Sequence, residues 1–131
     1  MIDVVAAVLV KDDKILIAKR KLEKVQGGYW EFPGGKVEKG EIPSESLIRE
    51  LKEEMEIVID VKEHIIDSIY DYGTHKVKLI GFISTILEGS IVLNDHDEYR
   101  WVTLNEIDNF KLAPADVEIA DAVKDRLSYI H

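Results

Sequence analysis

Apolar residues in the first quarter of the chain are grouped into short runs separated by polar segments. Residues 4–10 form a continuous run of β-branched and small apolar side chains, which predicts a buried strand. The polar residues 11–14 predict a turn, and the apolar run 15–18 predicts the strand that returns from it. Residues 19–28 are polar and end in two glycines, so we expect a loop there, followed by a short aromatic strand at 29–32.

The apolar positions change to a helical period in the next part of the chain. The Pro-Gly-Gly sequence at residues 33–35 is expected to interrupt regular structure, and residues 36–41 to form a loop. Residues 43–55 then place apolar side chains on one face of a helix. The members of this apolar stripe are Leu47, Ile48, Leu51 and Met55.

Strand-like runs return after this helix, and a second amphipathic segment ends the chain. The runs span residues 57–61, 65–72, 77–87 and 98–102. A polar loop at residues 94–97 precedes the last of them. Residues 114–131 predict a second helix. Its apolar face is predicted to carry Val117, Ala120, Val123 and Leu127.

The order of strands, helix, strands and helix predicts an α/β fold. We expect a mixed β-sheet covered by one helix on each face, which is a three-layer α/β/α sandwich. No linker, repeat or low-complexity stretch divides residues 1–131, which are interpreted as a single domain. Function has to be argued from a site, because one fold class supports many activities.

The net charge restricts the partners that the chain can bind. It is −9, from 26 acidic and 17 basic residues. A strongly acidic surface disfavours a nucleic-acid polymer, whose backbone requires basic contacts. It also disfavours an anionic nucleotide, unless part of the acidic excess holds a divalent metal ion that reverses the local field.

Cysteine is absent, which excludes disulfides, thiolate zinc sites and cysteine nucleophiles. This composition fits a cytoplasmic protein. No apolar run reaches the roughly 18 residues of a membrane span, so no membrane partner is expected. Residues 1–8 lack a basic region and are interpreted as part of the first strand, and not as a signal peptide.

The predicted helix at residues 43–55 carries clustered carboxylates. Glu50 lies three positions before Glu53 and four before Glu54, so their side chains share one region of the helix surface. Like charges at these spacings are unfavourable, and a hard cation such as Mg²⁺ would compensate them. A solvated acidic face is the alternative interpretation. The preceding Gly34-Gly35 favours a metal site, because it lets backbone oxygens approach a ligand closely.

The stretch from Gly35 to Ile57 resembles the Nudix box. That pattern is Gly, five residues, Glu, seven residues, then Arg-Glu-apolar-any-Glu-Glu-any-Gly-apolar. Its positions are filled here by Gly35, Glu41, Arg49, Glu50, Leu51, Glu53, Glu54 and Ile57. The late glycine of the family is Glu56 in this chain, which should cost about 1 kcal/mol if that glycine is a left-handed helix cap.

The resemblance extends beyond the box to the MutT-like branch of the family. Residues 32–36, Phe-Pro-Gly-Gly-Lys, and residues 112–116, Leu-Ala-Pro-Ala-Asp, are similar to segments of bacterial CTP pyrophosphohydrolases and their 8-oxo-dGTP diphosphatase relatives. The resemblance implies the Nudix fold. It also implies Mg²⁺-dependent hydrolysis, with Mn²⁺ as a substitute, of a nucleoside triphosphate to the monophosphate and diphosphate.

The same resemblance implies roles for the residues of the box. Glu53 and Glu54 would be metal ligands, together with the backbone carbonyl of Gly35. Glu50 would be a further ligand or the general base, and Arg49 would orient it. Catalysis is therefore expected to depend on Glu50, Arg49 and Glu53. Glu41 is expected to support the site structurally or through a water.

Substrate contacts are expected from both sides of the box. Arg20, at the end of the second strand, is a candidate phosphate ligand, although it could be an ordinary exposed arginine. Lys36 is a second phosphate candidate. In the late loop Glu98 is preferred over Asp95 and Asp97 as an additional metal ligand. His96 is interpreted as an exposed loop residue.

Recognition of the base is expected near the start of the second helix. Asp116 could accept a hydrogen bond from the exocyclic amine of cytosine, which favours CTP, dCTP or a modified dCTP. It could also cap the helix. Phe32 is a candidate for stacking on the base, as are Tyr29 and Trp30, although aromatic residues in a short strand often belong to a core.

Three alternatives to this functional assignment stay open. The first is a different substrate, such as 8-oxo-dGTP, a dinucleoside polyphosphate, ADP-ribose or capped RNA. Tyr70 and Tyr72 bear on the dinucleoside case, and the acidic net charge argues against a long RNA. The second is a non-catalytic nucleotide-binding Nudix domain. The third is an acidic interaction domain without enzymatic function. A monomer and a homodimer are both compatible with the sequence.

Overall fold

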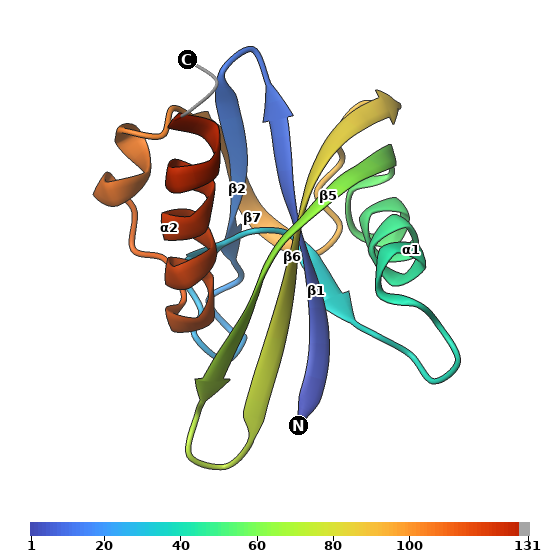
Figure 1. The fold of residues 1–131 in the computed structure, drawn as a ribbon, viewed down its shortest axis with the longest axis vertical. Coiled ribbons are helices and arrows are strands. Elements are labelled where there is room, and N and C mark those ends of the chain that lie inside the picture. The colour runs from blue at the N-terminus through green and yellow to red at the C-terminus, as the bar shows by residue number, and fades with distance from the viewer. Residues whose placement is uncertain (129–131) are drawn as a thin grey trace.

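The computed structural model describes residues 1–128 and places one β-sheet between two α-helices (Figure 1). The elements are β1 (Ile2–Lys11), β2 (Lys14–Arg20), β3 (Trp30–Glu31), β4 (Gly34–Lys36), α1 (Pro43–Met55), β5 (Val58–Asp71), β6 (Lys76–Glu88), β7 (His96–Val102), the 3₁₀ helix η1 (Glu106–Asn109) and α2 (Pro114–Ser128). The sheet runs in the order β3-β2-β1-β6-β5, with β4 also paired to β1 and β7 to β2. The β1–β6 pair is parallel and the others are antiparallel, so the predicted mixed sheet is confirmed.

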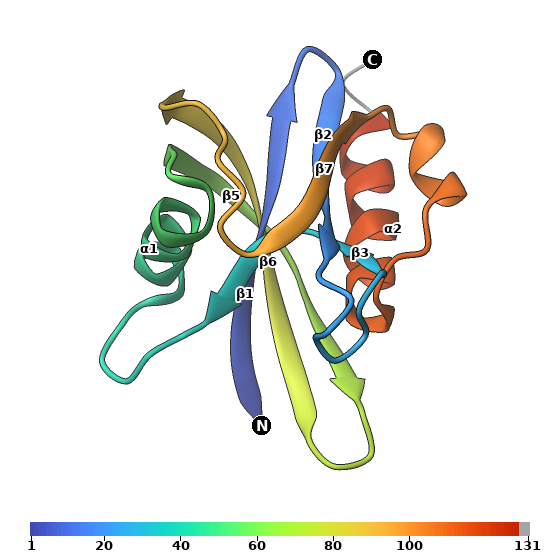
Figure 2. The ribbon, with the colours of Figure 1, turned by 180° about the vertical axis from the view of Figure 1, so that it is seen from behind.

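Alternate residues of the central strand supply two separate hydrophobic cores. Val5 and Leu9 of β1 belong to the core that also contains Leu51 of α1. Val8 belongs to the core that also contains Ile119 of α2. Successive side chains of a strand point to opposite faces, so each helix covers one face of the sheet. The view from behind shows the same arrangement of α1 and α2 on opposite sides (Figure 2), and the predicted three-layer sandwich is confirmed.

Two expected interruptions of the strands are wrong. The sequence predicts separate strands at residues 57–61 and 65–72, but β5 continues through the polar residues 62–64. Register shifts relative to β6 absorb the irregular pattern. The Pro-Gly-Gly segment also contributes to the sheet, since Gly34–Lys36 forms β4 against β1. A side chain at position 34 would overlap the backbone of β1, so this close pairing requires glycine.

Two expected loops are shorter than the sequence indicates. β2 extends to Arg20, into the segment predicted to form the first loop. β7 begins at His96, inside the polar segment predicted to form the late loop. In both places polar residues occupy strand positions, which the sequence pattern therefore assigned to loops. The backbone hydrogen bonds of a strand form whether its side chains are polar or apolar.

The first helix has the predicted bounds and most of the predicted apolar stripe. Leu47, Leu51 and Met55 are fully buried. Ile48 is predicted in the same stripe, but 40% of it is exposed. Ile48 directly follows Leu47, so its side chain is rotated by about 100° around the helix axis from that of Leu47 and points away from the sheet.

The second helix packs through a different set of residues than expected. Ala120, Val123 and Leu127 are buried as predicted, but 46% of Val117 is exposed. Ile119 takes its place in the core. Residues 129–131, which the sequence assigns to the end of this helix, lie outside the described residues. Within residues 1–128, neither helix is long and apolar enough to cross a membrane.

Helix α1 ends in a left-handed residue where the family pattern has glycine. Glu56 has φ 56° and ψ 35°, and its N–H donates to the carbonyl of Lys52 at 3.1 Å. The expectation of a left-handed cap at this position is confirmed. A β-carbon is unfavourable in this conformation, so the helix end carries local strain.

Candidate active site

Two adjoining cavities lie beside β1. The acidic cavity, of about 290 Å³, contains Gly35, Glu54 and Asp95 in its lining. The apolar cavity, of about 530 Å³, contains Tyr72 and Ala115. The residues shared by both linings are Val4, Arg20, Glu31, Lys36, Leu79 and Asp116. A ligand with a charged part and an apolar part could therefore occupy both cavities at once.

Glu54 is a largely buried carboxylate in the acidic cavity. Burial, together with the charges of Glu50 and Asp95, raises the pKa of its carboxyl group to about 9. Its Oε2 atom is buried and has no hydrogen-bond partner among the described residues. An orphaned carboxylate oxygen of this kind costs stability in the absence of a cation.

Glu50 lies against the backbone of Gly35. A β-carbon at position 35 would overlap the carboxyl group of Glu50, so only glycine allows this approach. Burial raises the pKa of Glu50, while the hydrogen bond from Arg49 opposes that rise. The carboxyl group of Glu50 is thus held at the position where the glycine loop and α1 meet.

Arg49 donates hydrogen bonds to three carboxylates, those of Glu41, Glu50 and Glu53. Its Nε and Nη2 atoms donate to the two oxygens of Glu41 at 2.8 and 2.9 Å. Its Nη1 atom donates to Glu50 at 3.0 Å and to Glu53 at 3.3 Å. The bond from Arg49, with one from Ser46, lowers the pKa of Glu41 to about 2. Arg49 therefore fixes the carboxylates of Glu41 and Glu50 relative to each other.

Glu53, expected as a metal ligand, is exposed to solvent. Its side chain is 59% exposed and is bonded to Arg49. Like Glu50, it is absent from the described lining of both cavities. Glu50 and Glu54 are one helical turn apart and face the sheet side, whereas Glu53 is turned by about 100° from Glu54.

Asp95, and not the preferred Glu98, faces the acidic cavity. Glu98 and Arg100 share one face of β7, because they are two residues apart. Arg100 pairs with Ile17, which belongs to the core under α2. Glu98 bonds to Arg100 at 2.8 Å on that face, so it points away from Glu54. The structure therefore favours Asp95 over Glu98 as a candidate metal ligand.

The acidic cavity has the donor chemistry that a hard divalent cation requires. Among residues 1–128, no three carboxylate or imidazole groups are already gathered as a metal site. Glu50 is bonded to Arg49 and Asp95 to Lys24. The unpartnered oxygen of Glu54, next to Gly35 and Asp95, nevertheless fits a cation with oxygen ligands.

The interpretation of His96 as an exposed loop residue is wrong. It is the first residue of β7 and is 4% exposed. Its Nε2 atom lies 2.9 Å from Oε2 of Glu31, and the other oxygen of Glu31 accepts a hydrogen bond from Arg20 at 2.9 Å. The arginine expected to bind phosphate is thus part of a partly buried polar network.

Asp116 is buried where the two cavities meet. Its Oδ1 atom accepts a hydrogen bond from the backbone N–H of Phe32 at 2.9 Å, so this oxygen does not cap α2. Burial, with the nearby charge of Glu31, raises the pKa of the Asp116 carboxyl group well above its usual value. The Phe32 side chain is 3% exposed and belongs to the core under α2. Little of its ring is therefore available to stack on a base.

The other two aromatic candidates also have structural contacts. Trp30 is 8% exposed and packs edge-on against Phe110, with ring centroids 5.1 Å apart. Tyr29 lies under the Lys111 ammonium group, 4.4 Å from its ring centroid. Neither residue appears in the described lining of the two cavities.

Two lining residues of the apolar cavity, His75 and Gln26, were not proposed from the sequence. Tyr72, considered there only for a dinucleoside substrate, stacks on His75 with centroids 5.5 Å apart and an interplanar angle of 21°. Tyr72 and His75 lie at the β5–β6 turn, and Gln26 lies in the loop after β2. The sequence around His75 and Gln26 carries no signal for a site, because only the tertiary structure brings these two loops together.

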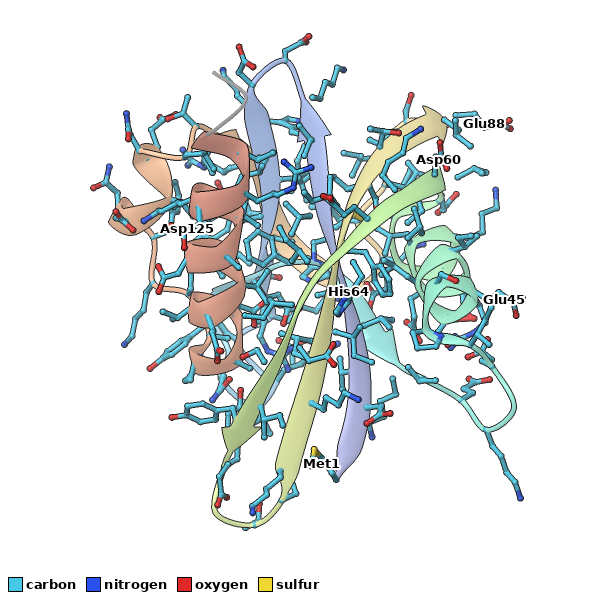
Figure 3. The ribbon with its side chains drawn as sticks, viewed as in Figure 1. Met1, Glu45, Asp60, His64, Glu88 and Asp125 are labelled. Atoms are coloured by element: carbon cyan, nitrogen blue, oxygen red, sulfur yellow. The ribbon has the colours of Figure 1, made fainter. Side chains whose placement is uncertain are left out.

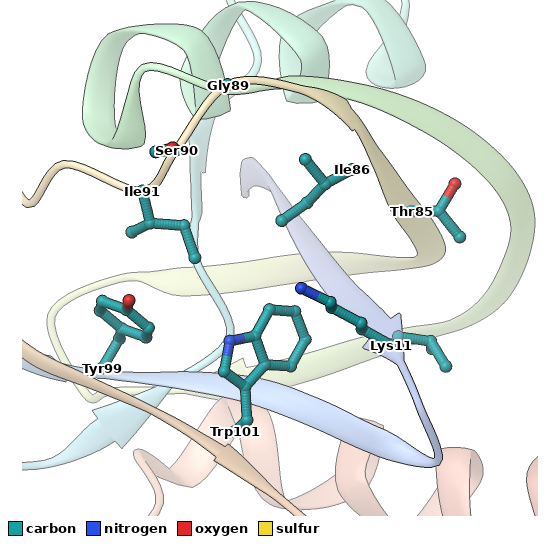
Figure 4. Close-up of a pocket in the computed structure, with 9 residues that line it drawn as sticks. Lys11, Thr85, Ile86, Gly89, Ser90, Ile91, Tyr99 and Trp101 are labelled. Carbon is teal, nitrogen blue, oxygen red and sulfur yellow. The ribbon is translucent and has the colours of Figure 1, made fainter.

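A third cavity, of about 430 Å³, lies apart from this site (Figure 4). Tyr99 and Trp101 of β7 line it together with Lys11. It shares no described lining residue with the acidic or the apolar cavity. None of the residues proposed for catalysis, metal binding or substrate binding is in its described lining.

The chain resembles known proteins over nearly its whole length. It matches the family model described as NUDIX domain over residues 1–123. CTP pyrophosphohydrolase of Escherichia coli (strain K12) is 35% identical over 122 residues, which cover 93% of this chain and 90% of that protein. 8-oxo-dGTP diphosphatase of Proteus vulgaris is 42% identical over 77 residues, which cover 57% of this chain and 67% of that protein.

The fold comparison agrees with the sequence comparison. The solution structure of the E. coli ORF135 protein superposes with a TM-score of 0.85 at 33% identity, covering 100% of this chain and 93% of that one. The residues matched by the family model and the residues superposed on this neighbour both include the glycine loop, helix α1 and the strands beside the two cavities of this chain. The chain therefore belongs to the NUDIX domain family and is a Nudix hydrolase.

Proposed function

We propose that the protein is a Mg²⁺-dependent nucleoside triphosphate pyrophosphohydrolase that acts on cytosine nucleotides. The observation that carries the proposal is the continuity of the two cavities through Arg20, Lys36 and Asp116. The acidic cavity suits a cation and the phosphates it neutralises, and the apolar cavity suits a nucleoside. The named activity of the E. coli relative supports the same class of substrate.

Glu54, Glu50, Asp95 and the backbone of Gly35 would hold the cation. Bound there, Mg²⁺ would supply stabilisation of the negative charge on the phosphate oxygens. Glu50 is placed to accept a proton from the attacking water, because its raised pKa makes it a stronger base than an exposed carboxylate. Arg49 holds Glu50 in one orientation through the 3.0 Å bond.

The phosphate chain would extend past Arg20 and Lys36. Both line the acidic and the apolar cavity, so a chain that crosses from one cavity to the other passes between them. A guanidinium group binds phosphate through several N–H donors at once, and an ammonium group acts as a compact charge. These two residues would bind the phosphates while the carboxylates of α1 act on the bond that breaks.

Asp116 supports the choice of cytosine. Its raised pKa favours the protonated carboxyl group, which offers one donor and one acceptor. The N3 acceptor and N4 amine of cytosine are the complement of that pair. The corresponding edge of guanine presents two donors and would suit a carboxylate instead. Tyr72, which lines the same cavity, would supply an apolar face for the base.

A second candidate is an 8-oxo-dGTP diphosphatase, favoured by the identity to the Proteus vulgaris enzyme of that name. A panel of normal, methylated and oxidised NTPs and dNTPs, with and without Mg²⁺, separates the two. Monophosphate and diphosphate formed fastest from cytosine nucleotides would support the first proposal. Preference for 8-oxo-dGTP would support the second. Turnover of ADP-ribose or dinucleoside polyphosphates alone would refute both.

Matched variants of α1 connect the activity to the proposed cation site. Glu54→Gln should remove most of the rate, because an amide is a much weaker ligand for Mg²⁺ than a carboxylate. Glu45→Gln makes the same change at an exposed position of the same helix (Figure 3) and should leave the rate unchanged. Equal rates in both variants would exclude the acidic cavity as the site of catalysis.

A further inference from the structure

A chain of three polar side chains links β7, β3 and β2 and reaches the wall of the two cavities. His96 lies 2.9 Å from one oxygen of Glu31, whose other oxygen accepts a hydrogen bond from Nη1 of Arg20 at 2.9 Å. The exposed fractions of the three side chains are 1%, 18% and 26%, so the exposure increases toward the cavities. Arg20 is the member of this chain that is placed to meet a ligand.

The position of His96 depends on a β-bulge. Lys19 pairs with Glu98, whereas the next residue, Arg20, pairs with His96, so Asp97 has no counterpart in β2. In a regular ladder Asp97 would be the residue that faces Arg20. The extra residue brings His96 to the face of the sheet where Glu31 lies. Bulges of this kind recur beside active sites, where they redirect a side chain.

Packing alone does not explain why an imidazole occupies the position of His96. Its Nδ1 atom is buried without a hydrogen-bond partner among the described residues. An apolar side chain of similar size would avoid that penalty. What the imidazole adds is the Nε2–H bond to Glu31, because a carboxylate oxygen can only accept.

The bond from His96 leaves Glu31 with one orientation, and Glu31 in turn orients the guanidinium. Arg20 also donates from Nε to the carbonyl of Val25 at 3.0 Å. The bonds from Nε and Nη1 fix the plane of the guanidinium group. Its Nη2 group has no hydrogen-bond partner among residues 1–128. A donor group held in this way loses little side-chain entropy when it binds an anion.

We infer that His96 and Glu31 are positioning residues that hold the Arg20 guanidinium in the orientation that binds the phosphate chain. The inference rests on the proposed function for the identity of the ligand. Glu31 also lines both cavities, but one of its oxygens is bonded to Arg20 and the other lies next to His96. In this scheme His96 and Glu31 therefore act through Arg20.

A direct test observes the guanidinium without any turnover. The Nε–H resonance of Arg20 in ¹⁵N-labelled protein can be identified by its loss in Arg20→Lys. We expect a sharp signal in the unaltered protein, and a shifted and broadened one in His96→Leu and Glu31→Gln. His96→Gln should restore it, since an amide N–H can also donate to Glu31. An unchanged signal in both His96→Leu and Glu31→Gln would overturn the inference.

The second test measures the affinity for an anion and the kinetics of hydrolysis. Inorganic pyrophosphate should bind about 10-fold more weakly to His96→Leu, in line with the usual loss of a supporting partner. The same variant should lower kcat/KM about 10-fold through KM, but less than about twofold in an Arg20→Ala background, because the effect passes through Arg20. Equal losses in both backgrounds would contradict the positioning role.

His64→Leu is the matched control, because His64 also bonds to a carboxylate, Asp67 at 2.7 Å, but on the exposed face of β5 (Figure 3). It should change neither the Arg20 signal nor kcat/KM. If His96→Leu does not fold, the Arg20 resonance of Glu31→Gln provides the comparison, because it is recorded without substrate. Absence of turnover in the unaltered protein would refute the proposed function, while the resonance of Arg20 would still decide the positioning role.

Discussion

Gly35 is the residue at which sequence chemistry and site geometry are most directly connected. Its α-carbon lies where a β-carbon would overlap the carboxyl group of Glu50. The obstructing atoms belong to the end of a flexible side chain, so Gly35→Ala should displace Glu50 and leave the fold intact. We predict a loss of about 100-fold in kcat, the usual result of moving a reacting group by about 1 Å.

Steady-state kinetics and a thermal melt of Gly35→Ala check this prediction. Gly40→Ala is the control, because a β-carbon there meets open space and the residue has φ +87°. That variant should lose about 1 kcal/mol of stability through backbone strain and keep its activity. Full activity in Gly35→Ala would show that the contact with Glu50 is not needed.

Glu54 makes the metal-free protein sensitive to alkaline pH. Its pKa is raised from the ordinary value of 4.5 to about 9 on folding, so the native state keeps a proton that the unfolded chain has lost between these values. The contribution of such a group to stability is greatest below the lower pKa and falls as the pH rises toward the higher one. Stability arising from this residue should therefore decline from about pH 5 to about pH 9.

Glu54→Gln should remove that decline, because an amide does not titrate. In EDTA we expect the variant to melt at a higher temperature than the unaltered protein. The difference between the two melting temperatures should increase as the pH is raised. Added Mg²⁺ should stabilise the unaltered protein and have little effect on the variant. A gap that does not depend on pH would refute the assignment of the buried charge to Glu54.

At the scale of the elements, helix α1 combines the carboxylates of the proposed site with an unfavourable C-terminal end. Glu56 is left-handed at the C-cap, although its side chain accepts a hydrogen bond from Asn94 at 3.0 Å. Glu56→Gly should stabilise the protein by up to about 1 kcal/mol, since glycine adopts this conformation without strain. Glu56→Ala keeps the strain and loses the bond, so it should not be stabilising. Urea denaturation of the two variants measures the difference.

The loop before α1 is fastened to the helix by Glu41. Its carboxylate accepts hydrogen bonds from Arg49, Ser46 and the backbone N–H of Glu38. The bonds lower its pKa from the ordinary value of 4.5 to about 2. The stability that Glu41 contributes is therefore present above the higher of these values and is lost as the pH falls toward the lower one.

Glu41→Gln should therefore lower the melting temperature at neutral pH and make little difference near pH 2, where the folded-state pKa of Glu41 lies. The activity of this variant should fall as well, because Arg49 loses its bidentate partner and no longer fixes Glu50. Thermal melts at several pH values, in the presence of EDTA, follow the first effect. A constant difference in melting temperature across the whole range would contradict it.

At the scale of the whole molecule, the fold and the proposed cation site are supported separately. The two hydrophobic cores lie on opposite faces of the sheet, and neither includes the carboxylates of the acidic cavity. Removal of metal with EDTA should abolish hydrolysis and leave circular dichroism and the cooperative melt in place. Mg²⁺ should restore the activity fully. Unfolding on chelation would show that the cation is structural.

The sequence by itself determined the features that depend on local periodicity and fixed spacing. Helix α1 has the predicted bounds because its apolar side chains recur at the helical period. The same spacing places Glu50 and Glu54 on one side of that helix, next to Gly35. These relations lie within a short stretch of chain, so neighbouring residues suffice to define them.

The tertiary structure decided every relation between distant strands. Glu31 and His96 are 65 residues apart, and the contact between them depends on the register of β2, β3 and β7. A single extra residue in β7 exchanges the face to which a side chain points, which is why His96 is buried. Such a shift leaves no local pattern in the sequence.

The same reason explains the choice between the late carboxylates. Asp95 and Glu98 are both acidic residues in a polar stretch, so their sequence context does not distinguish them. Pairing of β7 with β2 turns Glu98 toward the α2 side, while Asp95 meets Glu54 across the cavity. Local chemistry therefore identified the residue types of the candidate site. Long-range strand pairing decided which individual residues line the cavity, because a strand exposes each side chain to one face only.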